Sequence, residues 1–157
     1  MSGKIHNNAR VRAQLALRCI LLPLVAGKIA KGIELLQEIP GAGAAAEHGD
    51  MVTYNARIFL RKGDEVTQDA AILSRGRAHL KTRMIDGAEL IDHVTELGKR
   101  RCIAGIETAL YGMKTRGFRE VLVAPHLAYR ETGIPGLIPE NALLRIQLWV
   151  HDIRHAT

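Results

Sequence analysis

The chain has 157 residues, of which 47% are hydrophobic and 24% are charged. This composition is typical of one globular domain with a sizeable core and leaves little room for two domains. The formal net charge is +6 at pH 7, but aromatic residues make up only 4% of the chain, which disfavours a base-stacking surface for single-stranded nucleic acid. We therefore assign the positive charge to a solvent-exposed face and expect no specific nucleic-acid partner.

The spacing of cysteine and histidine gives no sign of a metal centre. Cys19 and Cys102 lie far apart in sequence and belong to no CxxC motif, so neither a disulfide framework nor a zinc site is predicted. The seven histidines, among them His93 and His126, form no pair at metal-ligand spacing on a helix. We expect no metal and no other cofactor, and a cytoplasmic location agrees with this cysteine usage.

The N-terminal segment has two interpretations. Residues 1–12 are polar and basic and residues 13–30 are mostly apolar, which has the outline of a secretory signal. Arg18 and Pro23 interrupt the apolar part, and no stretch reaches the roughly 18 apolar residues of a membrane span. We therefore favour a short amphipathic helix over 8–22, expect no membrane association, and divide the chain into an N-terminal extension (1–31) and a folded domain (32–157).

Strand and turn signals dominate the first half of the domain. Ile33–Ile39 is stopped by a Pro-Gly pair, and Met51–Leu60 is rich in β-forming residues and ends at a Lys-Gly-Asp turn. Residues 85–97 predict a third strand that opens with Asp86-Gly87. The charged stretch between the second and third strands indicates an exposed flap over about 67–88, because loops of this length are usually functional or mobile.

One helix and two strands follow. Ile103, Ile106, Leu110 and Met113 recur at helical spacing and predict a helix over 103–113. A compact apolar run predicts a strand over 120–124, and strict alternation predicts the last strand over 142–150, with Leu144, Ile146, Leu148 and Val150 on the buried face. Strands on both sides of one short helix indicate an α+β fold.

Three stretches carry a family resemblance: LGKRRCIAGIE at 97–107, GMK followed by a glycine at 112–117, and PHLAYRETGIPGLIPENA at 125–142. In order and spacing they resemble the FKBP-type peptidyl-prolyl isomerases. A PGAG turn at 40–43 and Tyr54 extend the likeness back to about Ile33. The resemblance implies an FKBP-like fold, in which a bent antiparallel sheet wraps around one short helix, and an enzyme that isomerises X-Pro bonds and assists protein folding.

The resemblance also implies a pocket between sheet and helix. In it the Tyr129 hydroxyl and the Ile103 backbone N–H bind substrate carbonyls, and Tyr54 completes the catalytic set. The substrate-binding residues implied by the resemblance are Val66, Cys102, Ile106, Ile134, Leu137, Ile138 and Ile146. For the aliphatic members, plain core packing is the competing interpretation, and for Cys102 it is an unreactive buried thiol.

The chain departs from the family pattern at the pocket floor. Ile106 stands where the family has a tryptophan, and Ile146 replaces an aromatic residue of the last strand. Val66 and Thr67 stand near the positions where the family has a Phe-Asp pair. We therefore expect reduced activity on proline-containing peptides and unfolded clients, and weak binding of macrolide inhibitors. The alternative is a peptide- or protein-binding module with the same fold, and charge alone leaves a nucleic-acid-associated protein as a third hypothesis.

Overall fold

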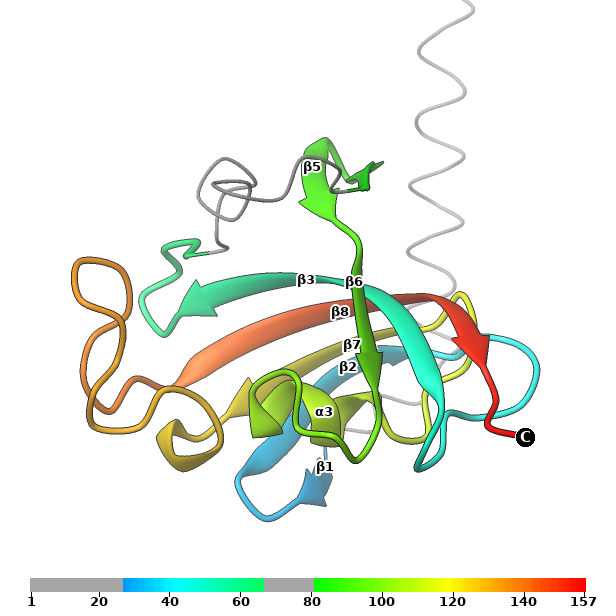
Figure 1. The fold of residues 1–157 in the computed structure, drawn as a ribbon. Helices are drawn as coiled ribbons and strands as arrows, with labels where there is room; N and C mark the ends of the chain where they lie inside the picture. Colours follow the sequence, from blue (N-terminus) through cyan, green and yellow to red (C-terminus); the bar gives the residue numbers. More distant parts are fainter. Residues whose placement is uncertain (1–26, 67–80) are drawn as a thin grey trace, which may run out of the picture.

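The computed structural model describes residues 27–66 and 81–157. Within them, one antiparallel sheet contains six strands, in the order β1 (Gly27–Ala30), β2 (Ile33–Ile39), β7 (Phe118–Val123), β8 (Leu144–Arg154), β3 (Met51–Leu60) and β6 (His93–Glu96). A separate hairpin contains β4 (Thr82–Ile85) and β5 (Ala88–Ile91). Figure 1 shows the helix α3 (Ala104–Leu110) against one side of the sheet and the hairpin projecting from the other.

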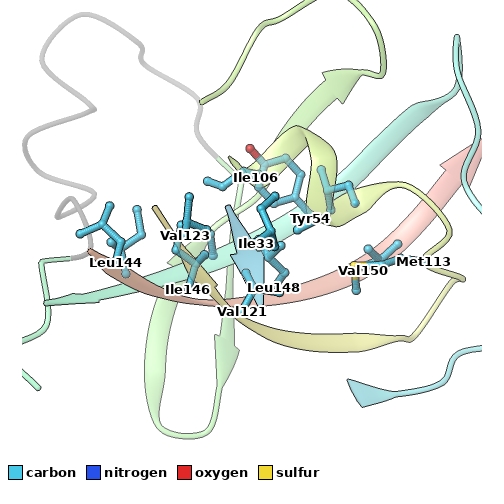
Figure 2. Close-up of a cluster of buried hydrophobic side chains, with 14 of the residues drawn as sticks. Ile33, Tyr54, Ile106, Met113, Val121, Val123, Leu144, Ile146, Leu148 and Val150 are labelled. Atoms are coloured by element: carbon cyan, nitrogen blue, oxygen red, sulfur yellow. The ribbon is translucent and has the colours of Figure 1, made fainter. Parts of the chain in front are cut away.

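The main core lies between α3 and the sheet. Leu144, Ile146, Leu148 and Val150 of β8 are all buried, which confirms the face predicted from their alternation. Ile106, Ala109 and Leu110 meet them from α3. Figure 2 shows Tyr54 of β3 and Ile106 within this cluster, together with Ile33 and the apolar side chains of β7 and β8.

The helix is shorter than the predicted 103–113, because tertiary contacts end it early. Tyr111 leaves the helical conformation with φ −57° and ψ 133°, and Gly112 turns the chain at φ +78°. The Arg119 guanidinium donates to the carbonyls of Ala109 and Tyr111 at 2.8 and 2.7 Å. These bonds satisfy carbonyl groups that a longer helix would have paired internally.

A glycine allows α3 to lie close to the sheet. A Cβ atom built on Gly105 would be only 2.3 Å from a methyl carbon of Val123 in β7 and 3.1 Å from the carbonyl oxygen of Leu127. Any larger side chain would therefore push the helix away from β7. The absence of a side chain at Gly105 thus lets the first turn of α3, which carries Ile106, lie close to the sheet.

Two strands have the bounds predicted from the sequence, and the others differ. Ile33–Ile39 and Met51–Leu60 have the predicted limits. The predicted strand 85–97 is instead the end of β4, then β5 and β6, because Asp86 and Gly87 take positive φ values of 48° and 81° and close a tight hairpin turn. The last strand continues to Arg154, and β7 begins at Phe118 and ends at Val123 instead of spanning 120–124.

The sheet begins ahead of the predicted domain boundary at residue 32. Strand β1 lies inside the segment 1–31 and pairs antiparallel with β2, with Lys28 opposite Glu34. The amphipathic helix predicted over 8–22 falls outside the described residues, as do residues 67–80 of the predicted flap. The rest of the flap, 81–88, contains β4 and the turn that leads into β5. No helix in the described ranges is both long and apolar enough to cross a membrane.

Candidate active site

All of the predicted site residues belong to one hydrophobic cluster. Tyr54, Val66, Ile106, Ile138 and Ile146 are buried within it. The others are half-buried and pack against it: Cys102, Ile103, Tyr129, Ile134 and Leu137. The fold therefore brings together side chains from β3, α3, β8 and the long loop between β7 and β8.

Tyr54 is anchored by polar contacts at the margin of the core. A hydrogen bond joins its hydroxyl to the Cys102 thiol, and the Thr95 hydroxyl donates to the Cys102 sulfur at 3.9 Å. Burial raises the pKa of Tyr54 far above its ordinary value and also raises the pKa of the Cys102 thiol. Both groups therefore stay protonated near neutral pH, and a protonated thiol is a poor nucleophile.

Ile103 precedes the first turn of α3 with an extended backbone, at φ −60° and ψ 144°. Its carbonyl accepts the Glu107 N–H at 3.1 Å, but its own N–H has no backbone acceptor in the described part of the chain. An amide N–H at the edge of a hydrophobic cluster is a natural donor for a carbonyl that arrives from outside. The role of this N–H in substrate binding stays a prediction.

Tyr129 lies in the loop that follows the short 3₁₀ helix η1 (Pro125–Leu127). The loop is fixed through its backbone, because the Tyr129 carbonyl accepts the Gly133 N–H at 3.0 Å and the Thr132 hydroxyl at 3.2 Å. Burial of the half-buried ring raises the pKa of the phenol. Within residues 27–66 and 81–157 the hydroxyl itself forms no hydrogen bond, so it remains open to a ligand.

The turn that carries Ile134, Leu137 and Ile138 is closed by its own backbone. The amides of Ile134 and Ile138 each donate to the other residue's carbonyl at 2.8 Å. Gly133 takes φ +58°, and a Cβ there would meet the Ile138 carbonyl oxygen at 2.3 Å. A cavity of about 420 Å³ beside this turn is lined in part by Leu137 and Ile138.

Another cavity, of about 220 Å³, is lined by none of the predicted site residues. It lies where the end of β2 meets the chain after α3, and Pro40 and Met113 are among its lining residues. In the described ranges no group of three or more His, Cys, Asp or Glu side chains is placed to hold a metal ion.

Two residues at this site were not predicted from the sequence. His93 and Thr95 are alternate residues of β6, and the register places His93 opposite Tyr54. The two rings lie 5.4 Å apart between centroids with an interplanar angle of 30°. The period of two along β6 could have put His93 and Thr95 on one face, but only the pairing of β6 with β3 shows that this face meets Tyr54.

Known proteins resemble this chain in sequence. The family model of the FKBP-type peptidyl-prolyl cis-trans isomerases matches residues 43–149. FK506-binding protein 2A of Rhizopus delemar is 27% identical over 97 residues, which are 57% of this chain and 58% of that protein. FKBP10 of Homo sapiens is 32% identical over 108 residues, or 64% of this chain and 18% of that protein. FKBP9 of Rattus norvegicus is 40% identical over 57 residues, and the match spans only 10% of that protein.

A solved structure shows the same fold. The N-terminal domain of FKBP42 from Arabidopsis thaliana matches 85% of this chain and 95% of that domain, with a TM-score of 0.64 and 17% sequence identity. The predicted combination of an antiparallel sheet with one short helix is thereby confirmed in the part that the structure describes. Since the family model covers more than half of the sequence, the chain belongs to the FKBP-type peptidyl-prolyl cis-trans isomerase family.

Proposed function

We propose that this domain isomerises X-Pro peptide bonds at the site formed by Tyr54, Ile103 and Tyr129. The observation that carries the proposal is that the Tyr129 hydroxyl and the Ile103 N–H, neither of which has a hydrogen-bond partner among residues 27–66 and 81–157, lie at the same hydrophobic cluster. Two donors at the margin of an apolar surface can bind two carbonyls of an extended peptide. The aliphatic side chains of the cluster then receive the proline ring.

The reaction needs no nucleophile. Rotation about a peptide bond has a barrier of roughly 18–20 kcal/mol because resonance gives the C–N bond double-bond character. Transfer of the prolyl amide into an apolar site disfavours its polar planar form, and hydrogen bonds from the site can hold the twisted form. Each ~1.36 kcal/mol of preferential transition-state binding accelerates the reaction tenfold. The protonated state of Tyr54 and Cys102 agrees with this mechanism.

The substitutions at the pocket floor set the expected strength of binding. Ile106 and Ile146 supply aliphatic area where the family resemblance implied aromatic rings. Aromatic side chains bury more surface and stack on flat groups, so we propose lower activity than in family members with the full aromatic set. We also propose weak binding of the family's macrolide inhibitors. Flexible or unfolded proline-containing chains in the cytoplasm are the proposed clients.

A proline-peptide isomerisation assay tests the proposal. The parent chain is compared with Tyr129→Phe, and Tyr111→Phe serves as the matched control because this tyrosine follows α3 and belongs to no part of the proposed site. We expect catalysis in the parent and the control and a loss in Tyr129→Phe. A parent that binds proline peptides without accelerating their isomerisation would instead identify a binding module. A parent that neither binds nor isomerises them would overturn both functions.

A further inference from the structure

A histidine borders the proposed X-Pro site. His93 lies on β6, an edge strand, directly opposite Tyr54 of β3. Its imidazole is half-buried and contacts the phenol ring in a tilted arrangement, at a centroid distance of 5.4 Å. In Figure 1, β6 runs beside β3 on its way to the loop before α3. The imidazole is therefore part of the surface that surrounds the Tyr54 ring.

The alternation of side chains along β6 fixes which way His93 faces. Thr95 is buried and donates to the sulfur of Cys102, the residue before Ile103. His93 lies two residues from Thr95 and so occupies the same face of the strand. Val94, between them, is 56% exposed and faces the opposite way. His93, Thr95 and Cys102 thus form a row along the side of the proposed site that Tyr54 also lines.

We propose that the His93 imidazole is a wall of the X-Pro site and determines its pH range: substrate binds when the ring is neutral and is excluded when the ring is protonated. The inference rests on the proposed function. A neutral imidazole is a flat, largely apolar ring that packs against a proline, whereas an imidazolium must lose its water when the proline covers it. Desolvating a charge without a partner is costly.

The surroundings of His93 favour the neutral form. Burial lowers the pKa of His93, and Asp92 opposes this effect only in part. The Asp92 carboxylate is already engaged, since Arg83 donates to it at 2.6 and 2.7 Å and the Asn55 side chain donates at 2.9 Å.

Charge from the other packed elements does not offset this preference. On the site side, the Tyr54 phenol faces His93 as a protonated, neutral group. Glu107 of α3 is buried and interacts with Cys102, and its carboxylate already accepts the Gly98 N–H at 2.5 Å. From β8, His151 lies close enough to Asp92 to interact with it, and its own pKa is lowered by burial and by Arg83. His93 therefore has no free carboxylate to stabilise its protonated form within the described residues.

The pH profile of kcat/KM for a proline peptide tests the inference from about pH 5 to about pH 8. We expect kcat/KM of the parent to fall at least about threefold at the acidic end, whereas His93→Phe keeps an apolar ring and stays nearly constant. His151→Gln is the matched control, because its amide can still donate to the Asn55 side chain while the second titratable imidazole is gone. The control should retain the acidic fall.

A titration of the parent requires no variant and separates the two proposals. The His93 ring is followed by NMR against pH, with and without a proline peptide. Peptide bound against a neutral ring should lower the pKa of His93, by linkage. An unchanged pKa in the presence of bound peptide, or an acidic fall that persists in His93→Phe, overturns the role of His93 and leaves isomerisation standing. A parent that binds peptide but never catalyses overturns the isomerase function, and the role of His93 is then decided by the pH dependence of that binding.

Discussion

Replacement of Tyr129 by phenylalanine removes one oxygen atom and leaves the ring. The hydroxyl of Tyr129 makes no hydrogen bond in the described residues, and its ring is half-buried against the core. The hydroxyl of Tyr54, by contrast, is bonded to Cys102 inside the protein. The two tyrosines therefore respond differently to the same substitution, and the pair forms an internally controlled experiment.

The magnitude follows from the energy of one hydrogen bond. A typical bond contributes about 0.5–1.5 kcal/mol net, so its loss from the transition state lowers kcat/KM about two- to twelvefold. Since Tyr129→Phe leaves no partner unsatisfied among residues 27–66 and 81–157, it should change the free energy of unfolding by less than about 0.5 kcal/mol. Tyr54→Phe removes the hydrogen bond between the Tyr54 hydroxyl and Cys102, which keeps its bond from Thr95, and should lower the free energy of unfolding by about 0.5–1.5 kcal/mol.

The assay measures isomerisation of a proline peptide at several concentrations, and urea denaturation gives the free energy of unfolding of the same preparations. Tyr129→Phe should lose rate with parental stability, and Tyr54→Phe should lose stability. Parental kcat/KM in Tyr129→Phe would refute the role of its hydroxyl at the site. A large loss of stability in Tyr129→Phe would show that the hydroxyl has a structural partner, and would refute the reasoning from its open position.

Three further substitutions test the packing around the site by urea denaturation. Gly105→Ala should lower the free energy of unfolding by about 1–3 kcal/mol, because the alanine Cβ would lie 2.3 Å from Val123. An unchanged free energy of unfolding would show that α3 can move. Ile106→Ala should lower the free energy of unfolding by about 2–5 kcal/mol, because the Ile106 side chain is only 6% exposed. A loss below about 1 kcal/mol would show that the Ile106 side chain lies in an open cavity. Asp50→Asn should lower the free energy of unfolding at pH 7 by about 1–2 kcal/mol. We expect a value near the lower end of this range, because the partner His155 is exposed and solvent screens the pair. Backbone N–H groups hold the pKa of Asp50 below its ordinary 3.8. The Asp50 carboxylate therefore stabilises the folded state above pH 3.8, and the difference in free energy of unfolding between the parent and Asp50→Asn should shrink as the pH falls below that value.

Local patterns were sufficient for the strands that end at strong turn signals. Ile33–Ile39 and Met51–Leu60 have the predicted bounds, because a proline or glycine turn interrupts each strand regardless of the rest of the fold. The buried face of the last strand was also predicted, since side chains alternate along any strand. The family resemblance supplied the predicted site residues, and its spacing was enough to select side chains that share one cluster.

Contacts between distant segments decided the remainder. The helix ends at Leu110 because Arg119 binds its last carbonyls. Besides the local turn at Asp86-Gly87, the predicted strand 85–97 is interrupted between β5 and β6 at Asp92, whose side chain binds Asn55 and Arg83. The contact between the rings of His93 and Tyr54 depends on the register of β6 against β3. The sequence by itself determined the periodicity of the elements and the identity of the family, because both are written in residues close along the chain. Only the tertiary structure decided which polar groups meet, because a one-residue change of register would place His93 on the opposite face of the sheet.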